Sequence, residues 1–134
     1  MKAKSLPKLK KQALDLYSEL VKYQFARDGK LNCYTCDKPL HLHTTDCQLG
    51  HYLSRGAYPN LVFHTNNSRL QCIRCNVWLH GNTVEFRIRL IAEIGIKEVE
   101  ELEAIRHYPI KLIRSEYEDM IESFKQQIKE IREA

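Results

Sequence analysis

The sequence lacks a long apolar run, and no apolar segment follows its basic first residues. No run reaches about 18 apolar residues, so we expect no membrane-spanning helix. Met1 to Lys11 is basic without the apolar core of a secretory signal, so we expect a protein of the cytoplasm. With 134 residues, of which 43% are hydrophobic, the chain has the length of a single domain with a modest core.

Charge is unevenly spread along the chain. The formal net charge of +4 divides into +5 for residues 1–30, +3 for residues 31–92 and −4 for residues 93–134. The excess of positive charge in residues 1–92 and of negative charge in residues 93–134 predicts that a polyanion binds the first two thirds of the chain. The alternative is an ordinary solvated surface.

Five cysteines are the strongest chemical signal. Cys33 and Cys36 form one Cys-x-x-Cys pair, and Cys72 and Cys75 form a second. Four thiolates at this double spacing predict a structural, tetrahedral Zn²⁺ site, which would order a loop-rich segment. The alternatives are unrelated thiol pairs or disulfides in a secreted domain. Cys47 has no partner at ligand spacing, and we expect a buried thiol.

Between the two pairs, the sequence predicts a looped β-hairpin. Gln48–Leu53 and Leu61–His64 are apolar or β-prone runs, and Gly, Pro and Asn turn residues lie between them. After the second pair, residues 76–80 have room for a short helix before Gly81. Strand, strand and helix in this order resemble the ββα-metal nuclease motif, also called HNH or His-Me finger.

The run GHYLSRGAYPNLVFHTNNSRLQCIRCNVWLHGNTVEFRIRLIAEIG strengthens that likeness. It resembles the NinG, or Rap, family of recombination endonucleases of lambdoid phages, from Arg27 to at least Gly95. The motifs that carry the resemblance are Cys-x-x-Cys, Gly-His-Tyr, Gln-Cys-x-x-Cys-Asn, and Gly-Asn followed by Glu85. The family implies a metal-dependent endonuclease that cuts branched double-stranded DNA such as Holliday junctions and D-loops. Host recombination proteins as further partners stay open, and for a phage-encoded protein we expect the host cytoplasm as location.

Two residues are predicted to carry the catalysis. His51 would be the general base, because imidazole accepts a proton from water near neutral pH. Asn67 falls on the middle Asn of the HNH pattern, where it would hold the loop or orient the His51 ring. The alternatives are a structural histidine and an Asn that merely makes a turn.

Hydrolysis of a phosphodiester at such a site calls for catalytic Mg²⁺ or Mn²⁺ with oxygen ligands. Gly50 stands where many HNH enzymes carry a metal-binding Asp or His, so one ligand is missing. Asn76 matches a ligand of the phage endonuclease VII arrangement, and His80 would be the final His of the pattern, one residue late. Glu85 could fill the vacancy or make a surface salt bridge, and Asp46 is a weaker candidate.

Three arginines and three aromatic residues are candidates for DNA contact. We expect at least one of the arginines to hold a phosphate; they are Arg55, Arg69 and Arg74. Tyr52, Tyr58 and Trp78 could stack on an unpaired base at a branch point. For Tyr52 and Trp78 we favour the hydrophobic core instead, since a small zinc domain needs large apolar side chains.

Helical periodicity flanks the predicted core on both sides. An N-terminal helix begins near Ser5 and Pro7, and its exposed lysines, Lys10 among them, either lie along phosphate or only aid solubility. Further helices are expected over residues 83–94 and 97–107, with a capping box at Ser115 and Glu118 that opens a last helix. The apolar stripe of this last helix packs either on the N-terminal helix or on a second subunit, and we slightly favour a homodimer.

The sequence therefore predicts one α+β domain. Residues 31–82 form a zinc-stapled ββα-metal core, residues 1–30 an N-terminal helix and residues 83–134 C-terminal helices. Two other functions stay open: a non-catalytic, zinc-organised DNA-binding module and a general HNH nicking endonuclease. A thiol redox protein is disfavoured, because four cysteines given to zinc leave no free dithiol.

Overall fold

Helix α1 (Leu6–Phe25) opens the chain of the computed structural model, which describes residues 3–134. Ser5 caps it by accepting a hydrogen bond from the Lys8 N–H at 3.4 Å, and Pro7 stands in the first turn, where its missing N–H costs nothing. This start confirms the prediction. None of the helices in residues 3–134 is long and apolar enough to cross a membrane.

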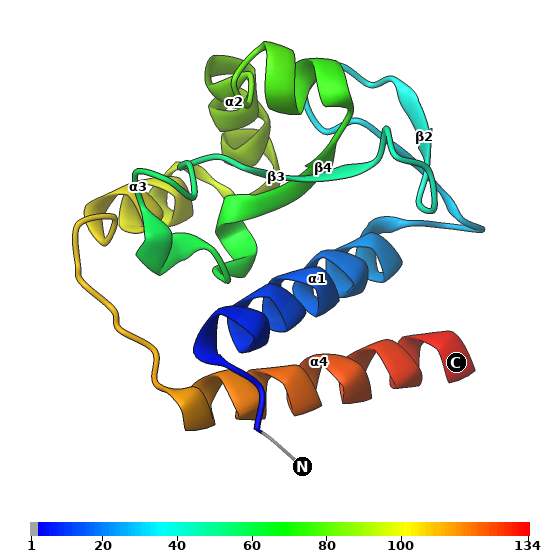
Figure 1. Ribbon diagram of the computed structural model, residues 1–134. Helices are drawn as coiled ribbons and strands as arrows, with labels where there is room; N and C mark the ends of the chain where they lie inside the picture. Colours follow the sequence, from blue (N-terminus) through cyan, green and yellow to red (C-terminus); the bar gives the residue numbers. More distant parts are fainter. Residues whose placement is uncertain (1–2) are drawn as a thin grey trace.

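Helix α4 (Arg114–Glu133) lies along α1, and the two helices run in the same direction (Figure 1). Leu9 and Ala13 of α1 pack against Tyr117 and Ile121 of α4. The stripe of α4 is therefore covered by α1 of the same chain, and not by a second subunit as slightly favoured above. The predicted cap was also wrong: the N-cap is Ile113 and not Ser115, so the helix begins two residues earlier, and Glu116 Oε1 accepts the N–H of Ile113 at 3.5 Å.

Two short antiparallel ribbons follow α1. Strand β1 (Lys30–Asn32) pairs with β2 (Pro39–His41), and β3 (Gln48–His51) pairs with β4 (Ser68–Gln71), with Gly50 opposite Arg69. The predicted second strand at Leu61–His64 was wrong. The chain there forms two 3₁₀ turns, Pro59–Leu61 and Thr65–Asn67, because Pro59 has no N–H for a ladder and His64 Nδ1 takes the N–H of Asn66.

The short helix predicted after the second cysteine pair is a single π turn, Arg74–Trp78, that starts two residues early. Helix α2 (Thr83–Ile94) has the predicted bounds and ends at Gly95, whose φ is 91°. Helix α3 (Ile96–Ala104) ends sooner than expected, since the chain turns at residues 105–107 ahead of Pro109.

The β3–β4 ribbon lies between α1 and α2, and three buried clusters hold these layers together (Figure 1). The first joins α1 to the ribbon and the cysteines, and Tyr17 Oη donates to Ser68 Oγ at 2.9 Å within it. The second joins the loop after β3 to α2 and α3 around Phe86. The third lies between α1 and α4. The ribbon is thus fixed on both faces, and its end at His51 is a rigid place for a functional group.

Candidate active site and metal centre

The four predicted cysteines meet at one point. The Sγ atoms of Cys33, Cys36, Cys72 and Cys75 all lie within 4.8 Å of one another, and those of Cys36 and Cys72 are 3.7 Å apart. A tetrahedral Zn²⁺ with Zn–S bonds of about 2.3 Å requires sulfurs about 3.8 Å apart. The cluster can therefore hold a metal ion such as zinc.

Hydrogen bonds favour the thiolate form of Cys33, whereas burial raises the pKa of Cys36 and of Cys72, and the neighbouring thiols raise the pKa of Cys36 further. The N–H of Cys75 donates to Cys72 Sγ at 3.5 Å, and Asn82 Nδ2 lies 3.7 Å from Cys75 Sγ. Burial raises the pKa of Cys33, but the backbone N–H groups of Cys72 and Thr35 outweigh it and bring the pKa to about 6. Thiolates are the form that binds zinc.

Asn82 is a contact that the sequence reasoning did not assign. The residues His80, Gly81 and Asn82 have φ values of 51°, 91° and 47° in succession, which is a left-handed turn. The turn swings the Asn82 amide onto Cys75. The signal was present in the Gly-Asn pair, because Gly and Asn are the residues that adopt this conformation most readily.

Cys47 is buried, 2% exposed, and lies outside the metal cluster. Burial is the main cause that raises the pKa of its thiol. The prediction of a buried, unligated thiol is confirmed.

His51 is the last residue of β3 and is 8% exposed. Its Nε2 lies 2.9 Å from the carbonyl oxygen of Val62. A carbonyl only accepts, so Nε2 carries the hydrogen and Nδ1 keeps its lone pair. Burial lowers the pKa of His51, the Val62 bond partly offsets this, and the charge of Arg55 lowers the pKa further. The ring is therefore neutral at pH 7 and ready to accept a proton at Nδ1.

Asn67 is fully buried and holds the loop between β3 and β4. Its Oδ1 accepts the N–H of Leu53 at 2.8 Å, and its Nδ2 donates to the carbonyls of Leu53 and Leu61 at 2.9 and 3.3 Å. The amide fixes the residue beside Val62, and so acts on the His51 ring only through the loop. Of the two predicted roles, the structure shows loop support.

Gln71, a second residue without a predicted role, occupies the space beside Gly50, where the HNH resemblance led us to expect a metal ligand. A Cβ at Gly50 would lie 2.0 Å from Gln71 Oε1. Gln71 is held by bonds from its Nε2 to the Gly81 carbonyl at 2.8 Å and to Thr35 Oγ1 at 2.9 Å. Its Oε1 is the one buried side-chain polar atom in residues 3–134 with no hydrogen-bond partner. Its position directly before Cys72 was the available signal.

The remaining predicted metal ligands lie on different elements: Asn76 on the π turn, His80 in the turn after it, Glu85 on α2 and Asp46 before β3. Asn76 stands on the π turn, where its Nδ2 donates to Gln48 Oε1 at 2.9 Å, so its Oδ1 is left for another partner. His80 is exposed in the left-handed turn. Glu85 accepts from Arg89 Nε at 3.0 Å, the salt bridge named as its alternative. Asp46 accepts the N–H of Ile73 at 2.8 Å and pairs with Lys38.

The three predicted arginines differ in what they contact. Arg69 is 4% exposed, pairs with Glu93 of α2 at 3.1 Å and packs over the rings of Phe25 and Tyr34. It is a structural link between β4 and α2 and does not face solvent. Arg55 and Arg74 are exposed and stay as candidates for phosphate.

The aromatic candidates divide in the same way. Tyr52 is 8% exposed and donates to Glu103 at 2.6 Å, which confirms its place in the core. Trp78 is 72% exposed, so the favoured core interpretation was wrong for this residue. The π turn projects its side chain outward while Cys75 faces the metal cluster. Tyr58 is half-buried and packs against His107.

The amino-acid sequence matches one family of phage proteins. The family model described as Bacteriophage Lambda NinG protein matches residues 1–134, the whole chain. The chain is 32% identical over 108 residues to Protein ninG of Salmonella phage P22, which covers 81% of this chain and 51% of the relative. It is 33% identical over 105 residues to Protein ninG of Escherichia phage lambda, which covers 74% of this chain and 50% of the relative.

The chain therefore belongs to the NinG family, as the resemblance predicted. It spans about half the length of the curated relatives that it matches. No solved structure matches it.

Proposed function

We propose that this protein is a metal-dependent endonuclease of the HNH, or ββα-metal, type that cuts branched DNA. One observation carries the proposal: a buried, neutral histidine stands at the end of a strand, its Nε2 is held by a loop carbonyl, and its Nδ1 is left as a base. A strand, a loop braced by an Asn, a second strand and a helical turn follow one another in the order expected of that nuclease motif, which supports the proposal.

His51 would take a proton from the water that attacks the phosphorus. The bond to Val62 supports this role, because it holds the ring in one tautomer and one orientation. Depression of the pKa by burial keeps the base unprotonated at neutral pH. Positioned general bases contribute roughly 10²- to 10⁴-fold to rate.

The residues near Gly50 suit a hard divalent cation. Asn76, whose Nδ2 donates to Gln48 on the same face of the ribbon as Gly50, offers its Oδ1, and oxygen donors with several waters are what Mg²⁺ and Mn²⁺ prefer. Gln71 Oε1 also lies on this face, but it is buried against Gly50, so a cation could reach it only if the Gln71 side chain moved. A cation held there would supply charge neutralisation at the phosphate and the leaving oxygen. Exposed Arg55 and Arg74 would contact flanking phosphates.

Selectivity for Holliday junctions and D-loops comes from the family resemblance, whereas the residues alone equally fit a general nicking enzyme. Exposed Trp78, beside Arg74 on the π turn, favours a branched substrate, because an exposed indole stacks on unpaired bases. The test is nicking of a supercoiled plasmid by the wild type and His51→Ala, with and without Mg²⁺. Binding without nicking by both proteins would leave the alternative, a zinc-organised DNA-binding module.

A further inference from the structure

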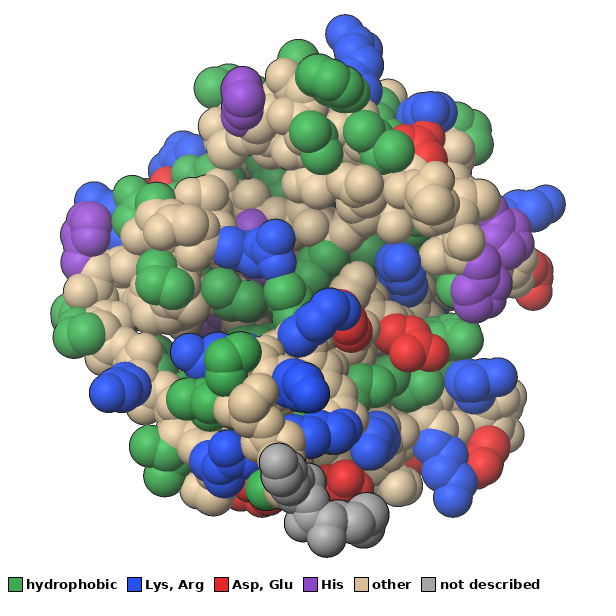
Figure 2. Space-filling model, in the orientation of Figure 1, with side chains coloured by type: hydrophobic (Ala, Val, Ile, Leu, Met, Phe, Trp, Pro, Cys, Tyr) green, Lys and Arg blue, Asp and Glu red, His purple; other side chains and the backbone are tan. Residues whose placement is uncertain are grey.

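A cleft of about 810 Å³ lies between the helical pair and the loop that follows β3. Its walls come from α1, from the loop between β3 and β4, from the segment before α4 and from α4 itself. The apolar lining is made by Leu6, Leu14, Pro59, Val62, Phe63, Ile110, Leu112, Tyr117 and Met120. In Figure 2 this is the hollow between the helical pair and the rest of the molecule.

Every charged residue in the lining is basic. Lys10, Arg55 and Lys111 line the cleft and are exposed, His64 adds an imidazole, and no Asp or Glu contributes to the lining. Figure 2 shows Lys and Arg side chains on both sides of the hollow. An apolar floor with a wholly cationic rim is complementary to a ligand that carries flat apolar groups on an anionic backbone.

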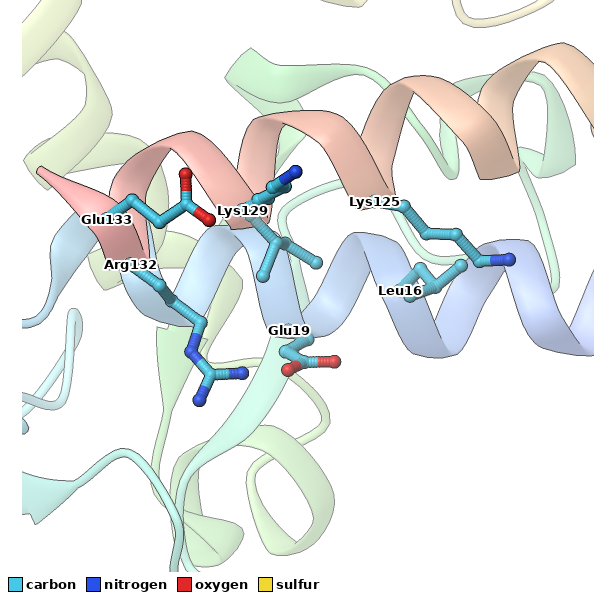
Figure 3. A pocket seen from close by; sticks show the side chains of 7 residues that line it. Leu16, Glu19, Lys125, Lys129, Arg132 and Glu133 are labelled. Atoms are coloured by element: carbon cyan, nitrogen blue, oxygen red, sulfur yellow. The ribbon is translucent and has the colours of Figure 1, made fainter.

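The hollow between α1 and α4 gives the contrast within the same molecule. It measures about 510 Å³, and Figure 3 shows Glu19 and Glu133 lining it together with Lys125, Lys129 and Arg132. Mixed charge of this kind offers no preference for a polyanion. The basic lining of the first cleft is therefore a local property and does not follow from the net charge of the chain.

The cleft is joined to His51 through two residues. Val62 lines the cleft, and its carbonyl holds His51 Nε2. Arg55 also lines the cleft, and its charge lowers the pKa of His51. A strand seated in the cleft would thus lie beside the residue proposed to activate water.

We propose that this cleft binds a short unpaired segment of DNA, with bases on the apolar floor and phosphates on Lys10, Arg55 and Lys111. Its volume falls in the range of ligand pockets, about 300–1,000 Å³, which suits a few unpaired nucleotides and not a duplex. The proposal rests on the proposed function and adds to it: the feature that the protein selects is an unpaired segment, which a D-loop carries, which a four-way junction exposes when bases at its exchange point open, and which linear duplex lacks.

The test is binding to a fluorescent thymidine oligonucleotide, measured by anisotropy with no added divalent cation, so that cleavage plays no part. The variant Lys10→Ala/Lys111→Ala removes two exposed cleft cations, and Lys125→Ala/Lys129→Ala removes two from the mixed-charge hollow as a matched control. Ile110→Ala shortens an apolar cleft side chain that is 59% exposed.

We expect the cleft double variant to bind about tenfold or more weakly, with a salt slope smaller by about 1 to 2, while the control binds as the wild type. Ile110→Ala should weaken binding without changing the slope. Wild-type affinity in the cleft double variant would overturn the proposal, and so would an equal loss on blunt duplex. If the wild type bound the oligonucleotide but nicked no DNA, the proposed function would be refuted, and the proposal that the cleft binds unpaired DNA would still stand.

Discussion

At the scale of single residues, the site depends on how neighbours constrain His51. A histidine exposed in a loop would sample both tautomers and several orientations. The Val62 carbonyl removes that freedom, and the Asn67 amide fixes the loop that carries Val62. The three hydrogen bonds of the Asn67 side chain thus help, through the loop, to orient the lone pair on His51 Nδ1.

The tautomer and pKa of His51 can be measured directly. Long-range ¹⁵N–¹H NMR of ¹⁵N-labelled protein should show His51 as the Nε2–H tautomer, titrating below its ordinary pKa of 6.5, because burial disfavours the imidazolium. Since the folded pKa is depressed, nicking should be constant above 6.5 and fall as pH drops through the lower folded value. An Nδ1–H tautomer, or a pKa above 6.5, would contradict this account.

Gly50 should be intolerant of any side chain. The Cβ of Gly50→Ala would meet Gln71 Oε1 at 2.0 Å, and two hydrogen bonds prevent the Gln71 amide from moving freely. We expect a loss of about 1–3 kcal/mol in the free energy of unfolding, measured with urea in the presence of zinc. Adding Gln71→Ala should cost less than the sum of the two single changes. Strict additivity would show that the two residues do not compete for space.

Residue chemistry was predictable where a motif imposes it. The cysteine spacing predicted the metal cluster, and the β-prone run Gln48–Leu53 predicted a strand that contains His51, which the structure ends at His51. Trp78, expected in the core, is exposed because the π turn projects it outward. Arg69, expected to contact phosphate, is buried because it pairs with Glu93 of α2. Both outcomes depend on contacts distant in sequence or on a rare turn, and no local pattern encodes them.

At the scale of elements, the cysteine cluster ties the turn between β1 and β2 to the segment that follows β4. The two ribbons have only three or four residues per strand, so neither is stable by its own hydrogen bonds. Metal binding in small modules contributes roughly 10–16 kcal/mol, enough to order such segments.

Removal of one cysteine should therefore release both metal and structure. We expect one zinc per chain in the wild type and much less in Cys36→Ser, accompanied by a lower unfolding temperature, because three thiolates leave the tetrahedral site incomplete. Metal content is measured by inductively coupled plasma mass spectrometry. Cys47→Ala, outside the cluster, is the control and should keep its zinc. Full zinc in Cys36→Ser would show that the cluster is not the site.

Substitution of Arg69, which links β4 to α2, should lower the stability of the protein, whereas substitution of an exposed arginine should lower its affinity for DNA. Arg69→Ala removes the ion pair with Glu93, which keeps only its hydrogen bond from Tyr34 Oη; because Glu93 is 39% exposed, we expect a loss of about 2–3 kcal/mol in the free energy of unfolding. Arg55→Ala should change stability by less than about 0.5 kcal/mol and weaken DNA binding. Urea unfolding and anisotropy measure the two effects. Equal destabilisation by both changes would contradict the assignment.

The helices were the easier elements to predict, since periodicity and caps are local signals: α1 begins after the predicted cap Ser5, and α2 begins at Thr83, where the helical periodicity starts. The loop between β3 and β4 was not, because β-prone residues such as Val62 and Phe63 favour a strand. Pro59 and the side chains of His64 and Asn67 override that preference with local hydrogen bonds.

At the scale of the whole molecule, the parallel pair α1 and α4 forms a base on which the ribbon and the cysteine cluster rest (Figure 1). Helix α1 covers the apolar stripe of α4 that a helical dimer would have used, so a second copy of the chain would have to bind at another surface. The cleft between base and loop is lined by basic side chains, and two of its lining residues act on His51: Val62 through its carbonyl and Arg55 through its charge. Substrate binding and water activation are thus proposed for one face.

The most direct measurement is cleavage of a four-way junction and of a matched linear duplex by the wild type and His51→Ala, with Mg²⁺ or Mn²⁺ and without added metal. We predict metal-dependent cutting of the junction, little cutting of the duplex, and a loss of roughly 10²- to 10⁴-fold in the variant, which should keep its zinc and its fold. Binding of the junction with no cleavage by the wild type, or undiminished cleavage by His51→Ala, would contradict the account.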